Sequence, residues 1–255
     1  MTTVPGVVDV ERDDSVAVVT LNEPRRRNVL SHKMVQDLVA AFDEIEADDR
    51  IRCVVVTGAG SAFCAGAELQ TLKDSAAGRF SDVERVYEGF LRILRCPLPT
   101  IAAVNGPAVG AGLNVALACD IRLASTSAVF ESRFTALHLH PGGGHTWLLT
   151  RAIGRQRATL MSLFGTALNS EQALQWALVT EVLAPEGLLP AARDLGGRLT
   201  DLEPEYVRRL TRTLRLAEVT PTHEAGLARE TEQQHWSTTR RNFLDALDRM
   251  VRRSR

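Results

Sequence analysis

Two short segments rich in glycine and alanine follow apolar runs that have the composition of buried strands. The first is TGAGSAFCAGAEL at 57–69, and the second is VNGPAVGAGLNVAL at 104–117. Where such a segment leads into a helix, the first backbone N–H groups of the helix attract negative charge. Small side chains also let a ligand atom approach the main chain. Two such corners brought together could form an oxyanion hole, in which backbone N–H groups stabilise an anionic oxygen.

The glycines of these segments also fit a purely structural role. Tight packing between a strand and a helix favours the same small residues, so the spacing alone leaves both interpretations open. A dinucleotide-binding fingerprint needs a third glycine after Gly58 and Gly60, but Phe63 occupies that position. The sequence also lacks the Gly-Lys-Ser/Thr of a phosphate-binding loop and the G-x-S-x-G of a serine hydrolase.

A few polar side chains near these corners could take part in proton transfer. Asn114 is the single polar residue in the apolar segment after the second corner, where it could orient a water molecule or simply be satisfied by local hydrogen bonds. His138, His140 and His145 cluster in the segment HLHPGGGH, and histidine titrates in the range that proton transfer requires. Their spacing fits a metal site poorly and no carboxylate lies within the loop, so we predict no metal.

The elements that would position these residues alternate along the chain. We predict strands at 16–21, 52–57, 101–104, 120–124, 128–131 and 179–183. We predict helices after Ser31 and at 81–95, from about 110, and at 145–153, 155–164, 170–176 and 187–200. The sequence is helical and rich in charge from about Pro204 onward. Buried strands that alternate with helices, followed by a helical extension, indicate an α/β fold.

Composition excludes some classes of partner. The chain has 30 basic and 31 acidic residues, a balance that gives no reason to expect binding of nucleic acid or an anionic membrane. The longest run without charge, 96–119, is interrupted by proline and glycine, so we predict a strand, a turn and a helix rather than a membrane span. Four cysteines without a CxxC pair, and no signal-peptide pattern in 1–14, predict buried free thiols in the cytoplasm.

Several long segments resemble the enoyl-CoA hydratase/isomerase family, also called crotonases. They are RRRNVLS, SAFCAGAEL, IAAVNGPAVGAGLNVALACDIRLAS and the turn PGGG, and they occur in the family's order over essentially the whole chain. The resemblance implies a crotonase-like spiral of ββα units over 1–197. It also implies a helical C-terminal region, 198–255, that helps to form a homotrimer or a hexamer built as a dimer of trimers. The ligand would be an acyl- or enoyl-CoA thioester, with no other cofactor.

The resemblance also assigns roles to backbone groups. The thioester carbonyl would lie between the N–H groups of Ala67 and Ala111, which would stabilise an enolate. The second donor is usually glycine in the family, so the extra methyl group of Ala111 would narrow the acyl pocket. The two catalytic glutamates of hydratases correspond to Asn114 and Phe134 here. Neither can exchange a proton near neutral pH, and each lost acid–base group costs about 10²–10⁴ in rate, so we do not expect ordinary hydration.

Substitutes for the missing acids lie nearby in the sequence. In related sequences the loop 138–145 borders the acyl pocket, so His140 is the first candidate. Glu131, about one turn from Phe134 if the backbone is helical there, is the second, although either could simply face solvent. The reaction would then be another enolate reaction, such as an isomerisation, a decarboxylation or C–C bond chemistry. The alternative is a non-catalytic protein that binds or senses acyl-CoA.

The resemblance places a further set of residues against the substrate. Arg26, Arg27 and Lys73 would contact the nucleotide of coenzyme A, although a solvated charged turn is the alternative. Glu68 is expected to form structural hydrogen bonds. The full predicted set is Arg26, Arg27, Ala65, Gly66, Glu68, Leu69, Lys73, Gly110, Phe134 and Pro141.

Overall fold

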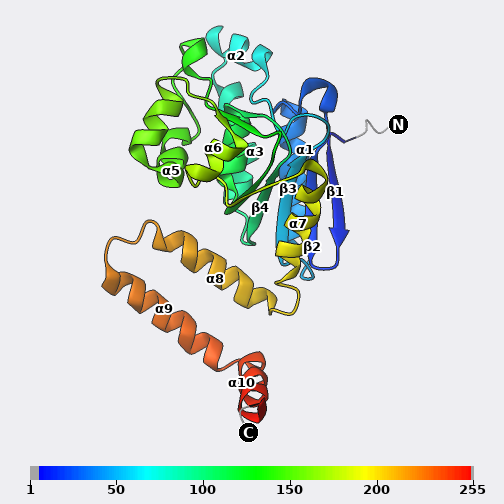
Figure 1. Cartoon of the computed structure of the whole chain (residues 1–255), viewed down its shortest axis with the longest axis vertical. Helices are drawn as coiled ribbons and strands as arrows, with labels where there is room; N and C mark the ends of the chain where they lie inside the picture. Colours follow the sequence, from blue (N-terminus) through cyan, green and yellow to red (C-terminus); the bar gives the residue numbers. More distant parts are fainter. Residues whose placement is uncertain (1–5, 254–255) are drawn as a thin grey trace. The chain divides into compact units, whose positions relative to one another are not determined.

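The computed structural model describes residues 6–253, and the chain divides into two compact units, Met1–Thr200 and Asp201–Arg255. Figure 1 traces both units along the sequence. Residues 1–5, the start of the segment in which no signal peptide was predicted, lie outside the described residues.

A six-stranded sheet with the order β1-β2-β3-β4-β6-β9 forms the centre of the first unit. Its strands are β1 (Val8–Asp13), β2 (Val16–Leu21), β3 (Cys53–Gly58), β4 (Thr100–Val104), β6 (Ile121–Ser125) and β9 (Glu181–Leu183). Only β1 and β2 are antiparallel; the other neighbours run parallel. All residues of β3 and β4 are buried, as expected for central parallel strands covered on both faces. Strand β1, an edge strand whose residues are mostly exposed, was not predicted.

A second, three-stranded sheet has the order β5-β7-β8. It consists of β5 (Ala108–Val109), β7 (Val129–Glu131) and β8 (Leu168–Asn169). The β5–β7 pair is parallel and joins Val109 to Glu131. This small sheet therefore brings the start of the second glycine-rich corner next to the segment that follows Glu131.

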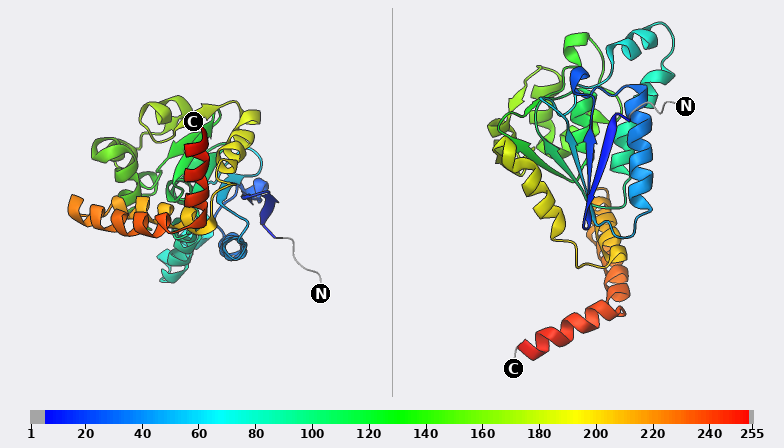
Figure 2. Two further views of the ribbon diagram at one scale, coloured as in Figure 1. Left: turned by 90° about the horizontal axis from the view of Figure 1, so that it is seen from below. Right: turned by 90° about the vertical axis from the view of Figure 1, so that its right-hand side faces the viewer.

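Alternate residues of the strands face opposite sides of the large sheet, so both of its faces are apolar. Helices cover both faces. In β2, Ala17 and Val19 belong to one core and Val16 and Val18 to another. The first core also contains residues of α1 (His32–Glu46), α3 (Ser81–Leu94), α4 (Ala111–Ala118) and α5 (His145–Ser162). The second contains residues of α7 (Pro185–Gly197), which lies on the opposite face from α1 in Figure 2.

The remaining helices of the first unit are α2 (Leu69–Ala76) and α6 (Ser170–Gln175), with 3-10 turns at Pro24–Arg26 and Thr135–Leu137. The predicted cap of α1 is confirmed, since the Ser31 side chain accepts a hydrogen bond from the Met34 N–H. Gly154 adopts φ 79° and interrupts α5, at the position between the two helices predicted there.

The second unit consists of α8 (Pro204–Ala217), α9 (His223–Thr238) and α10 (Arg241–Arg253), so the predicted helical region is confirmed. The guanidinium of Arg209 in α8 lies 4.3 Å from the ring centre of Trp236 in α9 and donates a hydrogen bond to Gln233. These contacts join the two helices. The trimeric or hexameric assembly stays a prediction.

Two further expectations can be compared with the fold. All four cysteines are buried and free, as predicted, and burial raises the pKa of Cys53 and of Cys64 to about 12. None of the helices between residues 6 and 253 has both the length and the apolar character that a membrane-spanning helix requires.

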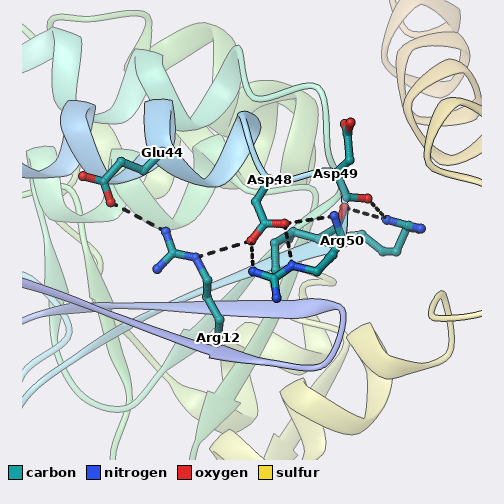
Figure 3. Close-up of polar contacts among 7 residues, drawn as sticks. Arg12, Glu44, Asp48, Asp49 and Arg50 are labelled. Atoms are coloured by element: carbon teal, nitrogen blue, oxygen red, sulfur yellow. Dashed lines mark hydrogen bonds and ion pairs between the residues drawn. The ribbon is translucent and has the colours of Figure 1, made fainter.

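An ion-pair network fastens the edge strand to the end of α1 (Figure 3). The guanidinium of Arg50 donates to both carboxylate oxygens of Asp48, at 3.0 and 2.8 Å. Arg12 of β1 lies 3.8 Å from Asp48 and 3.6 Å from Glu44. The hydrogen bonds from Arg50 are the main reason that the pKa of Asp48 is lowered to about 2. Such surface pairs contribute little individually, so the network mainly positions β1.

Asn28 holds the loop before α1 against the loop after β3. It is fully buried and adopts φ 56°. Its side-chain amide donates to the carbonyl oxygens of Ala59 and Ala62 at 2.9 Å, and its side-chain oxygen accepts the N–H of Glu23. Buried polar groups that lose their partners are costly, so this one side chain fixes two loops.

Replacing Asn28 by Ala should lower the free energy of unfolding by about 3 kcal/mol, because it removes the hydrogen bonds to the carbonyls of Ala59 and Ala62 and the acceptor of the Glu23 N–H. Urea denaturation measures the change. Asn22→Ala is the matched control, since it removes an exposed bond to Asp9 and should cost less than about 1 kcal/mol. Equal losses in the two variants would contradict this role for Asn28.

Candidate functional site

The two glycine-rich corners lie side by side. We define the first corner as Cys64–Ala67 and the second corner as Val109–Gly112. The N–H of Val109 donates to the carbonyl oxygen of Cys64 at 3.0 Å, and Cys64 also forms a parallel bridge with Ala108. The ends of β3 and β4, which are neighbours in the sheet, carry the chain toward this contact.

Glycine is required where the corners touch. A Cβ atom on Gly112 would lie 2.0 Å from the carbonyl oxygen of Cys64, and one on Gly66 would lie 2.6 Å from the carbonyl oxygen of Val109. Both distances are far below van der Waals contact. Gly66 also adopts φ +97°, which other residues rarely do. The close-packing interpretation of the glycines is therefore confirmed, as backbone packed on backbone.

The same contact brings two backbone N–H groups to one cavity. The Cβ position of Gly66 is 3.5 Å from the nitrogen of Ala111, and Ala67 is the next residue. Both alanines line a cavity of about 710 Å³, a volume suited to a small-molecule ligand. Within residues 6–253 neither N–H donates a hydrogen bond. Ala111 is also the first residue of α4, where the helix dipole is positive.

Most residues of the predicted site line this cavity. They are Arg26, Arg27, Ala65, Gly66, Ala67, Glu68, Leu69, Gly110, Ala111 and Phe134. The cavity also has lining residues that were not predicted, among them Val29, Leu72, Ser132 and Leu137. Five predicted residues are not among the lining residues: Lys73, Asn114, Glu131, His140 and Pro141.

Two of the arginines that line the cavity, Arg26 and Arg27, differ in their partners. The guanidinium of Arg26 donates to Glu23 at 3.0 Å and also to Glu68, and the hydrogen bond to Glu23 is the main cause of its raised pKa. Glu68 thus forms a hydrogen bond between loops, in keeping with the structural role expected for it. Arg27 forms no ion pair within the described part of the chain, so its charge is available at the cavity.

Neither of the two substitutes chosen for the missing acids, Glu131 and His140, is among the residues that line the cavity. β7 ends at Glu131 and the backbone that follows is not helical, so Glu131 is not one helical turn from Phe134. Both carboxylate oxygens of Glu131 accept hydrogen bonds from Arg133, at 2.9 and 2.7 Å. His140 is exposed, and its ring nitrogen lies 2.8 Å from the carbonyl oxygen of Pro141. The expectation that His140 borders the acyl pocket therefore does not agree with the set of lining residues.

A buried hydrogen-bonded chain lies beside the second corner instead. The Nδ1 atom of His145 is 2.7 Å from the Asn114 side-chain oxygen, and its Nε2 atom is 2.9 Å from the Ser132 hydroxyl oxygen. Each of the three residues is only 1% exposed. The ring of Phe134 packs edge-on against His145, with centroids 4.8 Å apart. Of these three hydrogen-bonded residues, Ser132 is the one that lines the cavity.

The partners of His145 fix its tautomer. The amide oxygen of Asn114 can only accept, so Nδ1 carries the proton and Nε2 accepts from the Ser132 hydroxyl. Burial lowers the pKa of His145 to about 4, so the ring is neutral at pH 7. In the sequence His145 was grouped with its neighbours in the loop and was not selected. Only the fold brings it within reach of Asn114, 31 residues earlier in the chain.

The low pKa of His145 predicts a specific loss of stability in acid. Between the ordinary pKa of 6.5 and the folded value of about 4, the unfolded chain binds a proton that the folded chain does not. Protonation of His145 therefore leaves the free energy of unfolding unaffected above pH 6.5. It lowers this free energy by about 3 kcal/mol as the pH falls toward 4. Urea denaturation at pH 7 and pH 4 should show this extra loss in the wild type and not in His145→Gln. Equal losses in both proteins would contradict a buried neutral imidazole.

Comparisons with known proteins identify the family of the chain. The family model described as enoyl-CoA hydratase/isomerase matches residues 11–250. A probable enoyl-CoA hydratase of Mycobacterium tuberculosis, EchA14, is 49% identical over 174 residues, which is 67% of each chain. The 1,2-epoxyphenylacetyl-CoA isomerase of Escherichia coli is 41% identical over 192 residues, 73% of each chain.

Solved structures give the same result for the fold. The crystal structure of an enoyl-CoA hydratase subunit from Geobacillus kaustophilus matches with a TM-score of 0.90 and 29% identity, over 97% of this chain and 95% of that one. The predicted crotonase fold is thus confirmed. The chain belongs to the enoyl-CoA hydratase/isomerase family, the crotonases, whose enzymes act on coenzyme A thioesters.

Proposed function

We propose that this protein binds an acyl- or enoyl-CoA thioester in the cavity and stabilises its enolate between the N–H groups of Ala67 and Ala111. One observation carries the proposal: the two corners meet backbone to backbone, so both unpaired N–H groups belong to one cavity. Donors already aimed at a developing oxyanion need no reorganisation during the reaction. Each is typically worth about 10²–10³ in rate.

The residues at the edge of the cavity support a coenzyme A ligand. Arg27 has no ion-pair partner among the described residues, and arginine suits phosphate groups. Arg26 is held close by through Glu23 and Glu68. The apolar lining near the second corner, including Phe134 and Leu137, suits the acyl group.

The reaction we propose is an enolate reaction other than simple hydration. Hydration needs groups that activate water, but the Asn114 side chain is directed to His145 and Phe134 contributes only a phenyl ring to the cavity. Isomerisation, decarboxylation or C–C bond chemistry all pass through the same enolate. An isomerisation fits the name of the relative from E. coli. A non-catalytic acyl-CoA binder is the second candidate, and the same two side chains favour it.

Three measurements test this function. We expect saturable binding of butyryl-CoA by calorimetry, exchange of its α-protons in D₂O by mass spectrometry, and slow loss of the enoyl absorbance of crotonyl-CoA. Fast hydration of crotonyl-CoA would contradict our account of Asn114 and Phe134. Binding without any exchange would favour the non-catalytic binder, and absence of binding would remove the thioester ligand altogether.

The corner contact itself can be tested with a glycine substitution. Gly112→Ala would place a methyl group 2.0 Å from the carbonyl oxygen of Cys64, so the corners must separate. We expect α-proton exchange to fall by about 10²-fold or more, comparable with loss of one oxyanion donor. Gly187→Ala is the matched control, because nothing lies within 4 Å of its Cβ position and alanine is the better helix former. Unchanged exchange in Gly112→Ala would show that the corner contact is not needed.

A further inference from the structure

The proposed function leaves one set of buried polar groups without a task. Ser132, His145 and Asn114 are each 1% exposed and form a continuous hydrogen-bonded chain. Burying three polar side chains is favourable only if all are well paired, and the distances of 2.9 and 2.7 Å meet that condition. The order of groups is a hydroxyl, an imidazole and an amide that orients the imidazole. In other enzymes this order activates the hydroxyl.

The chain of groups ends at the second corner. β5 and β7 are paired at Val109 and Glu131, and the N–H of Gly110 donates to the carbonyl oxygen of Glu131 at 2.8 Å. Ser132 follows Glu131 directly, so it lies next to the corner that presents the Ala111 N–H. Ser132 and Phe134 both line the cavity, and the His145 ring, which is not among the lining residues, packs edge-on against Phe134.

We propose that the Ser132 hydroxyl, backed by His145 and oriented through Asn114, is the group that exchanges a proton with the bound thioester. This inference rests on the proposed function. The substrate's α-proton passes to Ser132 Oγ as the hydroxyl proton passes to His145 Nε2. The electron pair of the C–H bond becomes the enolate, whose oxygen lies at the Ala67 and Ala111 N–H groups. Reversal returns a proton to carbon, so no bond to the protein forms and no other reactant is needed.

The environment favours proton transfer over nucleophilic attack by Ser132. A nucleophile must come within bonding distance of the carbonyl carbon, but a residue that is 1% exposed has little freedom to do so. A proton can move over hydrogen-bond distance, directly or through one water molecule. Burial lowers the pKa of His145, and the negative charge of an enolate formed nearby favours the imidazolium again. The charge pair therefore forms only when substrate reacts.

The test compares α-proton exchange of butyryl-CoA in D₂O with its binding, using the full-length protein and four variants. Ser132→Ala and His145→Gln should each slow exchange by about 10²-fold or more, while the dissociation constant changes less than about threefold. Ser132→Thr keeps a hydroxyl group and should restore much of the rate. Ser170→Ala, which removes a buried hydroxyl bonded to Thr126 outside the cavity, should leave exchange unchanged.

The outcomes separate this inference from the proposed function. If the wild type exchanges protons and Ser132→Ala keeps the wild-type rate, the proton carrier is refuted and the oxyanion hole remains. If the wild type neither binds nor exchanges, both proposals fail. A stable acyl group on Ser132, detected by mass spectrometry, would show a nucleophile and would also overturn the proton carrier. Thermal melting identifies any variant that does not fold. If Ser132→Ala does not fold, the exchange rate of Ser132→Thr tests the proposal in its place.

Discussion

The structure depends on one contact, in which the main chain of the second corner packs directly against the main chain of the first. Gly112 lies so close to the carbonyl oxygen of Cys64 that no side chain fits between them. Two parallel strands, β3 and β4, and the small β5–β7 pair deliver the corners to this point. In this contact the N–H of Val109 is paired with the carbonyl oxygen of Cys64, whereas the N–H groups of Ala67 and Ala111 have no partner among the described residues. The same glycines thus allow the close packing of the corners and place two free backbone N–H groups at the cavity.

The surroundings of the corners show how the fold supports this contact. Asn28, fully buried, ties the loop before α1 to the loop after β3 and so steadies the approach to the first corner. Beside the second corner, the hydrogen bonds from Ser132 through His145 to Asn114 connect the segment after β7 with α5 and α4. Polar side chains in both places are fully paired, which lets them fix geometry at a low energetic cost. The cavity between them combines backbone donors, an apolar lining and Arg27.

Much of this could be predicted from local patterns in the sequence. β-branched runs predicted the central strands, and small residues after two of them indicated the corners. The N–H groups of Ala67 and Ala111 were assigned through the resemblance to the crotonases. β1 was missed because an exposed edge strand lacks a buried apolar pattern. His140 was chosen because its loop borders the acyl pocket in related sequences, but sequence does not show which ring of that loop turns inward. That difference depends on the contact of His145 with Asn114, which links segments far apart in the chain.

The central claim is that the thioester carbonyl oxygen accepts hydrogen bonds from both corners at once. Infrared difference spectroscopy of butyryl-CoA labelled with ¹³C at the carbonyl carbon tests it most directly, because hydrogen bonding to a carbonyl oxygen lowers its stretching frequency. Our account predicts a clear shift to lower frequency on binding to the wild type. A bound thioester whose carbonyl frequency equals that in an apolar solvent would contradict it.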